Sequence, residues 1–236
     1  MNLQNNKELV FQSVAQAAEQ AQRLKDSVNI IAVTKYVDCE TTQELVRTGI
    51  QHIGENRVDK FLDKYHALKD ENLTWHLIGS LQRRKVKDVI NYVDYFHALD
   101  SVKLAKEIDK RAQHVIKCFL QVNISKEESK HGFLVEDLEL VLPELEKLEN
   151  VQIVGLMTMA PFEASHEELN QIFEKAHQLQ KELKKKQLNN MPFSELSMGM
   201  SRDYPKAIAQ GTTRSTSRCA ASCRTGFGTA LSRSRR

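Results

Sequence analysis

The sequence places a lysine at the end of a short apolar run, where its amine is positioned for covalent chemistry. Lys35 closely follows Ile-Ile-Ala-Val, a run that is typical of a buried strand. A lysine is almost never buried without a partner, and desolvation lowers the pKa of its amine. The neutral amine can then attack a carbonyl and form a Schiff base. The alternative is a strand-end lysine that reaches water or pairs with Glu55, and spacing alone favours this alternative.

The turn Ser-Met-Gly-Met-Ser at 197–201 is the second candidate, because its residue types suit a phosphate cradle. Gly199 lets the backbone approach a ligand closely, and Ser197 and Ser201 carry hydroxyl donors. A helix expected over 202–210 would bring its positive amino end to the same place. In the other interpretation Ser201 merely caps that helix, with Asp203 near the first turn. The motif alone leaves the two interpretations even.

An amine-bearing strand end and a phosphate cradle together indicate a phosphorylated aldehyde, of which pyridoxal phosphate is the obvious example. The histidines and cysteines favour no metal site. His76 alternates with Trp75 and Leu77 in an expected strand, so it faces either the pocket or the core. Cys219 and Cys223 lack a matching second pair. No HExxH or similar ligand spacing links the other histidines, which are His52, His66, His97, His114, His131, His166 and His177.

Strand-like runs alternate with helical patterns after an N-terminal helix expected near 7–24. The expected strands are 29–35, 52–56, 74–80, 95–100, 116–123, 151–159 and 193–199. The expected helices are 41–48, 58–69, 83–92, 102–113, 135–149, 166–187 and 202–210, and Pro143 should kink or divide its helix. Such alternation predicts parallel βαβ units in an α/β, TIM-type (β/α)8 barrel with one strand unaccounted for. A doubly wound open sheet is the alternative, although neither GxGxxG nor GxxxxGK(S/T) follows the first strand.

Polar or small residues stand at the carboxyl ends of these strands, where barrels place their chemistry. One polar residue at a loop means little, but an ordered set on one rim predicts a pocket there. The set comprises Lys35, Glu55, Asn56, His76, Gly79, Ser80, Asp100, Asn123, Met157 and residues 197–201.

The composition is that of an ordinary globular protein, with 236 residues, 41% hydrophobic and 28% charged. The net charge of +3 comes from the end of the chain, because six arginines and no acid lie from Arg214 onward, which leaves −3 for the rest. We therefore expect no nucleic-acid partner. Neither a secretory signal nor a membrane-spanning run is present in the sequence. The four cysteines show no paired spacing, which indicates a reducing, cytoplasmic location.

Six segments between about residue 5 and Thr213 form an ordered set: AVTKY (32–36), HIGENR (52–57), WHLIGSLQ (75–82), NISKEESKHGF (123–133), GLMTMAP (155–161) and SMGMSRDY (197–204). This set resembles the pyridoxal phosphate homeostasis proteins, single-domain barrels related to the barrel domain of alanine racemase. The resemblance implies that Lys35 forms the Schiff base with pyridoxal 5'-phosphate. It also implies that Asn56, His76 and Met157 line the pocket and that Ser197, Gly199 and Ser201 serve the phosphate.

The resemblance stops after Thr213. The family continues with a motif like GTTEVRLG, whose eighth-strand arginine faces the cofactor's ring nitrogen, whereas this chain reads GTTRSTSRC. The codons CGA AGT ACG TCT CGG T encode Arg-Ser-Thr-Ser-Arg, and one base later they encode Glu-Val-Arg-Leu-Gly. A frameshift or sequencing error is therefore our hypothesis, which resequencing across codon 213 tests. We expect the eighth strand to be lost or altered, with a barrel over 1–213 and a disordered basic tail over 214–236.

The resemblance implies a carrier or buffer of vitamin B6 rather than an enzyme. We therefore predict no catalytic residue and no metal site. A racemase-like enzyme acting on amino acids is the alternative. Racemases need a second acid/base on the other face of the cofactor, and this chain has no room for the added domain that supplies it. The expected partner is the small-molecule cofactor, with pyridoxal-phosphate-dependent apoenzymes as candidate recipients. We expect no membrane partner, and we expect the protein to be a monomer.

Overall fold

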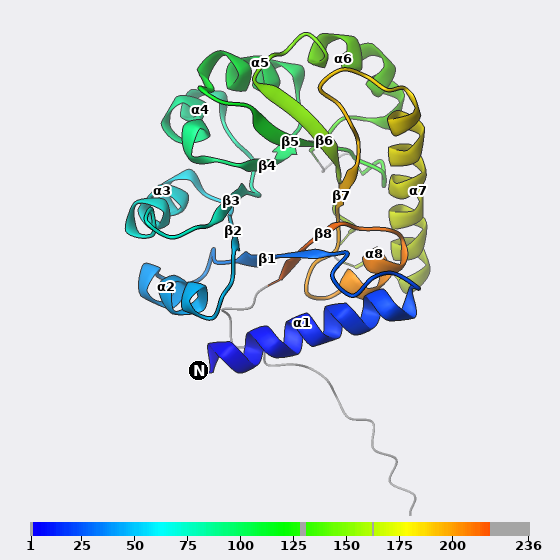
Figure 1. Ribbon diagram of the computed structural model, residues 1–236. Coiled ribbons are helices and arrows are strands. Elements are labelled where there is room, and N and C mark those ends of the chain that lie inside the picture. Colours follow the sequence, from blue (N-terminus) through cyan, green and yellow to red (C-terminus); the bar gives the residue numbers. More distant parts are fainter. Residues whose placement is uncertain (1, 128–130, 162, 218–236) are drawn as a thin grey trace, which may run out of the picture.

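Eight short parallel strands form the centre of a computed structural model, which describes residues 2–127, 131–161 and 163–217. The strands pair in chain order, and β8 returns to β1 to close a barrel (Figure 1). This arrangement confirms the predicted TIM-type barrel. The strands are Asn29–Val33 (β1), His52–Glu55 (β2), Thr74–Leu77 (β3), Tyr95–Leu99 (β4), Ile116–Gln121 (β5), Val151–Met157 (β6), Glu195–Ser197 (β7) and Arg214–Ser217 (β8).

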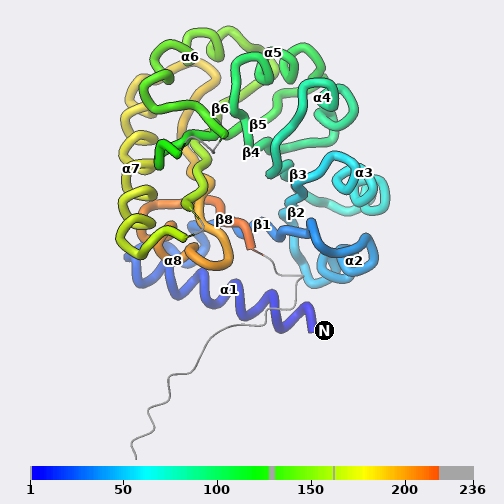
Figure 2. Tube along the Cα trace, turned by 180° about the vertical axis from the view of Figure 1, so that it is seen from behind, coloured from blue at the N-terminus to red at the C-terminus, as the bar shows by residue number. Residues whose placement is uncertain are grey.

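Helices follow the strands and surround the barrel (Figures 1 and 2). They are Leu3–Gln20 (α1), Cys39–Arg47 (α2), Val58–Ala67 (α3), Arg83–Val89 (α4), Val102–Arg111 (α5), Leu138–Leu145 (α6), His166–Lys185 (α7) and Tyr204–Ala209 (α8), with 3-10 turns Ile90–Tyr92 (η1) and Val135–Asp137 (η2). Helix α6 contains Pro143 and continues for two residues beyond it, so the proline does not divide the helix. Among the described residues, no helix has both the length and the apolar character that crossing a membrane requires.

Local sequence signals explain where these helices begin and which face they bury. Helix α7 starts with a capping box, in which Ser165 accepts from the backbone N–H of Glu168 and the Glu168 side chain accepts from the backbone of Ser165. Its apolar residues recur at helical spacing and include the fully buried Phe173. Burial of one such side chain contributes about 1.5–3 kcal/mol. The helices are thus held to the barrel mainly by apolar contact.

The predicted N-terminal helix is present as α1 and lies beside α8 (Figures 1 and 2). Ser13 and Tyr204 share a hydrogen bond between their hydroxyls. The Arg23 guanidinium, just beyond α1, donates to the carbonyl oxygen of Ile208 at 2.8 Å. These contacts join the two ends of the barrel sequence outside the strands.

The expected loss of the eighth strand is wrong. Strand β8 pairs with β1 from Asn29↔Arg214 to Ala32↔Ser217, and with β7 at Ser197↔Arg214. Pairing uses backbone groups, which Arg-Ser-Thr-Ser supplies as well as any other non-proline residues would. The eighth strand is therefore altered in side chains but present. The barrel extends to Ser217, and the rest of the predicted basic tail lies outside the described residues.

Candidate functional site

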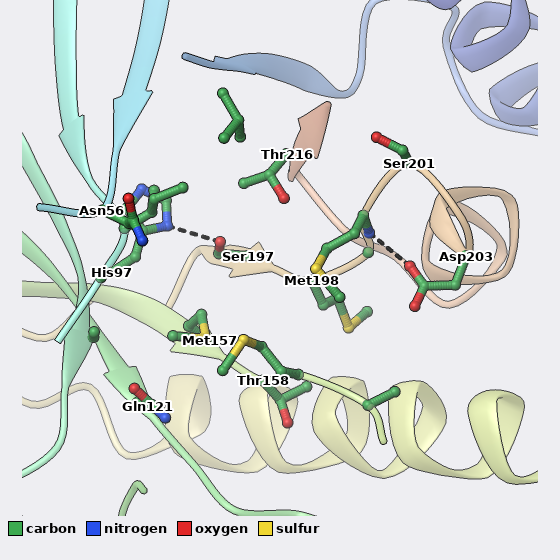
Figure 3. A pocket seen from close by; sticks show the side chains of 18 of the residues that line it. Asn56, His97, Gln121, Met157, Thr158, Ser197, Met198, Ser201, Asp203 and Thr216 are labelled. Carbon is green, nitrogen blue, oxygen red and sulfur yellow. Dashed lines mark hydrogen bonds between the residues drawn. The ribbon is translucent and has the colours of Figure 1, made fainter. Parts of the chain in front are cut away.

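A cavity of about 760 Å³ lies at the carboxyl ends of the strands. Parallel strands in a barrel bring all these ends to one rim, so residues distant in sequence meet there. Of the seven residues predicted for the cofactor, six line the cavity: Lys35, Asn56, Met157, Ser197, Gly199 and Ser201. Figure 3 shows Asn56, Met157, Ser197 and Ser201 around it. The structure therefore brings the strand-end lysine and the hydroxyl-rich turn to one pocket.

Lys35 lies two residues beyond the end of β1 and is half-buried. Its Nζ is 5.1 Å from the centroid of the Tyr36 ring, a cation–π contact. The alternative pairing with Glu55 is wrong, because that carboxylate accepts from Lys64 Nζ at 2.7 Å. The Lys64 amine also donates to the carbonyl oxygen of Thr34 at 2.6 Å. The buried lysine thus takes the acidic partner and leaves the Lys35 amine on the cavity wall.

The turn after β7 has a backbone shape that requires glycine. Gly199 has a φ of +85°, and a Cβ built there would lie 2.6 Å from the Cβ of Ala207. Its carbonyl oxygen accepts from the Ser215 hydroxyl at 3.1 Å and from the Thr216 N–H at 3.3 Å, which ties the turn to β8. The altered eighth strand therefore still supports this turn.

The interpretation of Ser201 as a helix cap is wrong. Helix α8 begins at Tyr204, and Asp203 is its N-cap residue. The Asp203 carboxylate turns back and accepts from the Met200 N–H at 2.6 Å, as the dashed line in Figure 3 shows. Ser201 is exposed and lines the cavity instead. The helix is also shorter than the predicted 202–210, because Pro205 sits in its first turn and Gly211 follows its end.

His76 is the predicted residue that does not line the cavity. It is fully buried in β3, where it bonds two other histidines, His52 and His97. His97 lines the cavity in its place and holds the Ser197 hydroxyl at 2.8 Å (Figure 3). The sequence did contain a signal for His97. It stands two residues after Tyr95 in a short strand, so the two side chains lie on the same face of the strand.

Burial sets the charge of these histidines. Burial, and to a lesser extent the positive Arg214, lowers the pKa of His97 from its ordinary 6.5 to about 3. Burial also holds the pKa of His76 well below its usual value, with further lowering by His97, Arg214 and His52. Both imidazoles are therefore neutral at physiological pH, each with one N–H and one acceptor nitrogen.

Arg214 occupies the barrel interior near the amino ends of the strands. Its guanidinium forms a buried ion pair with Glu195, donates to the Tyr95 hydroxyl at 2.7 Å, and lies 4.1 Å above the Tyr95 ring. Thr216, two residues on, lines the cavity. Thr216 stands where the motif implied by the resemblance carries its arginine, and in this chain it brings a hydroxyl to the cavity wall.

Comparison with known proteins agrees with this geometry. Residues 12–215 match the family model described as the alanine racemase N-terminal domain. The pyridoxal phosphate homeostasis protein of Aquifex aeolicus is 38% identical over 207 residues, which cover 86% of this chain and 90% of that protein. The chain belongs to the pyridoxal phosphate homeostasis protein family. The family member from a Synechocystis species is 36% identical over 80% of this chain and 88% of its own length.

Solved structures place the family in the barrel class. PipY of Synechococcus elongatus, whose structure was solved with PLP bound, is 36% identical and superposes with a TM-score of 0.76, covering 86% of this chain and 97% of its own. An alanine racemase of Clostridium difficile superposes with a TM-score of 0.65 at 14% identity, over 88% of this chain and 55% of the racemase. At that identity the comparison shows a shared fold.

Proposed function

We propose that the cavity binds pyridoxal 5'-phosphate and that Lys35 carries it covalently. The single observation that supports this most is the meeting of the Lys35 amine with Ser197 and Gly199 at one cavity. When bound, the cofactor supplies an aldehyde carbon that a neutral primary amine attacks. Lys35 is the lysine among the residues that line the cavity, and it extends from the end of β1.

The cavity suits a phosphate at the turn opposite Lys35. Gly199 lets the turn lie close against helix α8, where a Cβ would meet Ala207, and Ser197 and Ser201 bring hydroxyl groups to the cavity wall. Asn56 offers an amide, which is suited to orienting a polar ring substituent. Met157 contributes an apolar, adaptable surface against which a flat ring can pack. The residues present thus fit a phosphorylated aromatic aldehyde.

We infer further that the protein stores and releases the cofactor in the cytoplasm rather than turning over amino acids. The names of the family members from Aquifex and Synechocystis support this role. Both described cysteines, Cys39 and Cys118, are free thiols, which suits a reducing compartment. A racemase-like activity is the alternative. Chiral chromatography of L-amino acids incubated with the loaded protein separates the two, because racemisation that vanishes in Lys35→Ala would establish an enzyme.

The visible absorption spectrum tests the binding proposal directly. Purified protein is mixed with pyridoxal phosphate, freed of excess, reduced with borohydride and mapped by peptide mass spectrometry. We expect a yellow protein with the reduced label on Lys35. Lys35→Ala should lose the colour, while Lys103→Ala, which removes an exposed lysine from α5, should keep it. A folded but colourless protein, or label spread over surface lysines, would overturn the proposal.

A further inference from the structure

Three histidines and a serine form one continuous hydrogen-bonded chain inside the barrel. His52 Nδ1 lies 3.0 Å from His76 Nε2, and His76 Nδ1 lies 2.9 Å from His97 Nε2. His97 Nδ1 lies 2.8 Å from Ser197 Oγ. The four residues come from β2, β3, β4 and β7. Because β4 and β7 are not neighbours in the barrel, the last bond crosses its interior.

The chain connects the two ends of the barrel. Ser197 lines the cavity at the carboxyl ends of the strands. His52 is the first residue of β2, is half-buried, and lines a second hollow of about 510 Å³ between the amino ends of β1 and β2 and helix α1. The two middle histidines, His76 and His97, are 0% and 1% exposed, so no water shell interrupts the path. A polar path thus runs from one mouth of the barrel to the other.

The atoms that meet restrict the neutral chain to two arrangements. A neutral imidazole has one N–H, so when His76 donates from one nitrogen it must accept at the other. In the first arrangement every histidine carries hydrogen on Nδ1, and His97 donates to Ser197 Oγ. In the second every histidine carries hydrogen on Nε2, and Ser197 donates to His97. We name these the outward state and the inward state.

The two states present different groups to the cavity. In the outward state Ser197 Oγ accepts from His97, so its own hydrogen is available to an acceptor in the cavity. In the inward state that hydrogen is used by His97, and Ser197 offers only an acceptor lone pair. An anion in the cavity, such as a phosphate, therefore selects the outward state, because it needs donors.

We propose that His52, His76, His97 and Ser197 act as a proton relay that couples an anionic ligand in the cavity to the tautomer of His52 at the opposite mouth. This inference rests on the proposed function only in taking the anion to be a phosphorylated ligand. In this relay the histidines are positioning residues for Ser197. Binding in the cavity changes the tautomer of His52 at the amino end of β2.

The proton count of the switch balances. On going from the inward to the outward state, Ser197 Oγ takes one proton from the cavity side and passes its own to His97 Nδ1. His97 passes its Nε2 proton to His76 Nδ1, and His76 passes its Nε2 proton to His52 Nδ1. His52 then releases its Nε2 proton at the amino mouth. One proton enters, one leaves, and each residue remains neutral.

Charged neighbours keep the relay neutral and give its outer end a different character. Burial lowers the pKa of all three histidines, and Arg214 lowers it further. Asp94 and Glu195 act in the opposite sense on His52 alone. The Tyr95 ring stacks on His76 at 4.8 Å between centroids. His52 is thus the member that exchanges a proton with solvent most readily.

Nitrogen-15 NMR of histidine-labelled full-length protein tests the relay, because pyrrole-type and pyridine-type ring nitrogens have separate resonances. Without ligand, His52, His76 and His97 should all carry hydrogen on the same ring position, Nδ1 or Nε2. The three residues should also report the same population of the two states. Mixed tautomers, or an imidazolium in the chain, would overturn the proposal. This measurement needs no cofactor, so it decides the relay even if the protein does not bind pyridoxal phosphate.

Ligand addition and one variant supply the second arm. With pyridoxal phosphate bound, as its absorption confirms, all three histidines should shift to the Nδ1–H form. In His76→Gln the bound ligand should still shift His97 but leave His52 unchanged, since an amide cannot pass the tautomer on. His166→Gln, which alters an exposed histidine at the start of α7, should keep the native response. An unchanged His52 in the native protein, or a full response in His76→Gln, would overturn the relay.

Discussion

The Nζ of Lys64 lies 2.7 Å from Oε1 of Glu55, and both side chains are almost completely removed from solvent. The same amine donates to the backbone of Thr34 at 2.6 Å, and the Thr34 hydroxyl donates to the same carboxylate oxygen at 3.1 Å. Thr34 precedes Lys35, and Glu55 precedes Asn56. This buried cluster therefore joins the ends of β1 and β2 directly behind two residues that line the cavity.

Lys64→Met should destabilise the protein by about 3–5 kcal/mol, because it leaves the Glu55 carboxylate buried without its counter-ion. Urea unfolding followed by circular dichroism measures this free energy. The double variant Lys64→Met with Glu55→Gln should recover part of the loss. Lys106→Met is the control, since Lys106 pairs with Glu144 on the exposed surface, where such a pair contributes at most about 1 kcal/mol. Equal losses in Lys64→Met and Lys106→Met would contradict this account.

Gly199→Ala should weaken binding of pyridoxal phosphate and lower stability. The new Cβ would meet the Cβ of Ala207 at 2.6 Å, on a backbone whose φ of +85° already costs an alanine about 1–2 kcal/mol. Gly49→Ala is a matched control, because Gly49 has a φ of +89° but only the Lys7 amine near its Cβ, at 3.4 Å. A spectroscopic titration and thermal unfolding should show a greater loss at Gly199. If Gly49→Ala lost as much affinity, the cradle would not lie at Gly199.

Lowering the pH from 6.5 toward 5 should destabilise the protein through His97. Its pKa is about 3 when folded and near 6.5 when unfolded, so the unfolded chain binds more protons between these values. Stability therefore falls as pH falls through this window, by up to about 1.4 kcal/mol per pH unit for one such histidine. Free energies of unfolding at pH 5.0 to 7.0 measure the slope. His97→Gln should have a shallower slope and His166→Gln an unchanged one; identical slopes in all three proteins would refute the assignment.

Truncation should separate the eighth strand from the tail. A chain ending at Ser217 keeps the pairing of β8 with β1 and β7, so it should remain folded and monomeric. A chain ending at Thr213 loses β8 and exposes the edges of β1 and β7, which favours aggregation. Size-exclusion chromatography with light scattering distinguishes the two. If the chain that ends at Ser217 aggregated, residues 218–236 would be needed for the fold.

Local pattern was sufficient to predict the barrel and most of the cavity. The first seven strands lie in segments that the sequence pattern predicted, and the helices follow from their spacing, because both periods are properties of the local backbone. Lys35, Asn56 and Ser197 stand at strand ends, and parallel closure brings all such ends to one rim. The eighth strand was mispredicted for a related reason. The side chains after Thr213 differ from those of the family motif, but β8 is held by backbone hydrogen bonds, which do not depend on them.

The tertiary structure alone decided which polar residues meet. His76 shows the same alternation whether it faces the cavity or the barrel interior, and only the register between β2, β3 and β4 places it between His52 and His97. Glu55 is the nearest acid to Lys35 in the strand pattern, yet Lys64 reaches it from α3. The sequence by itself determined the elements and the chemistry available at their ends. Barrel closure decided partners as distant as His97 and Ser197, which are a hundred residues apart, because no local period encodes a contact across the interior.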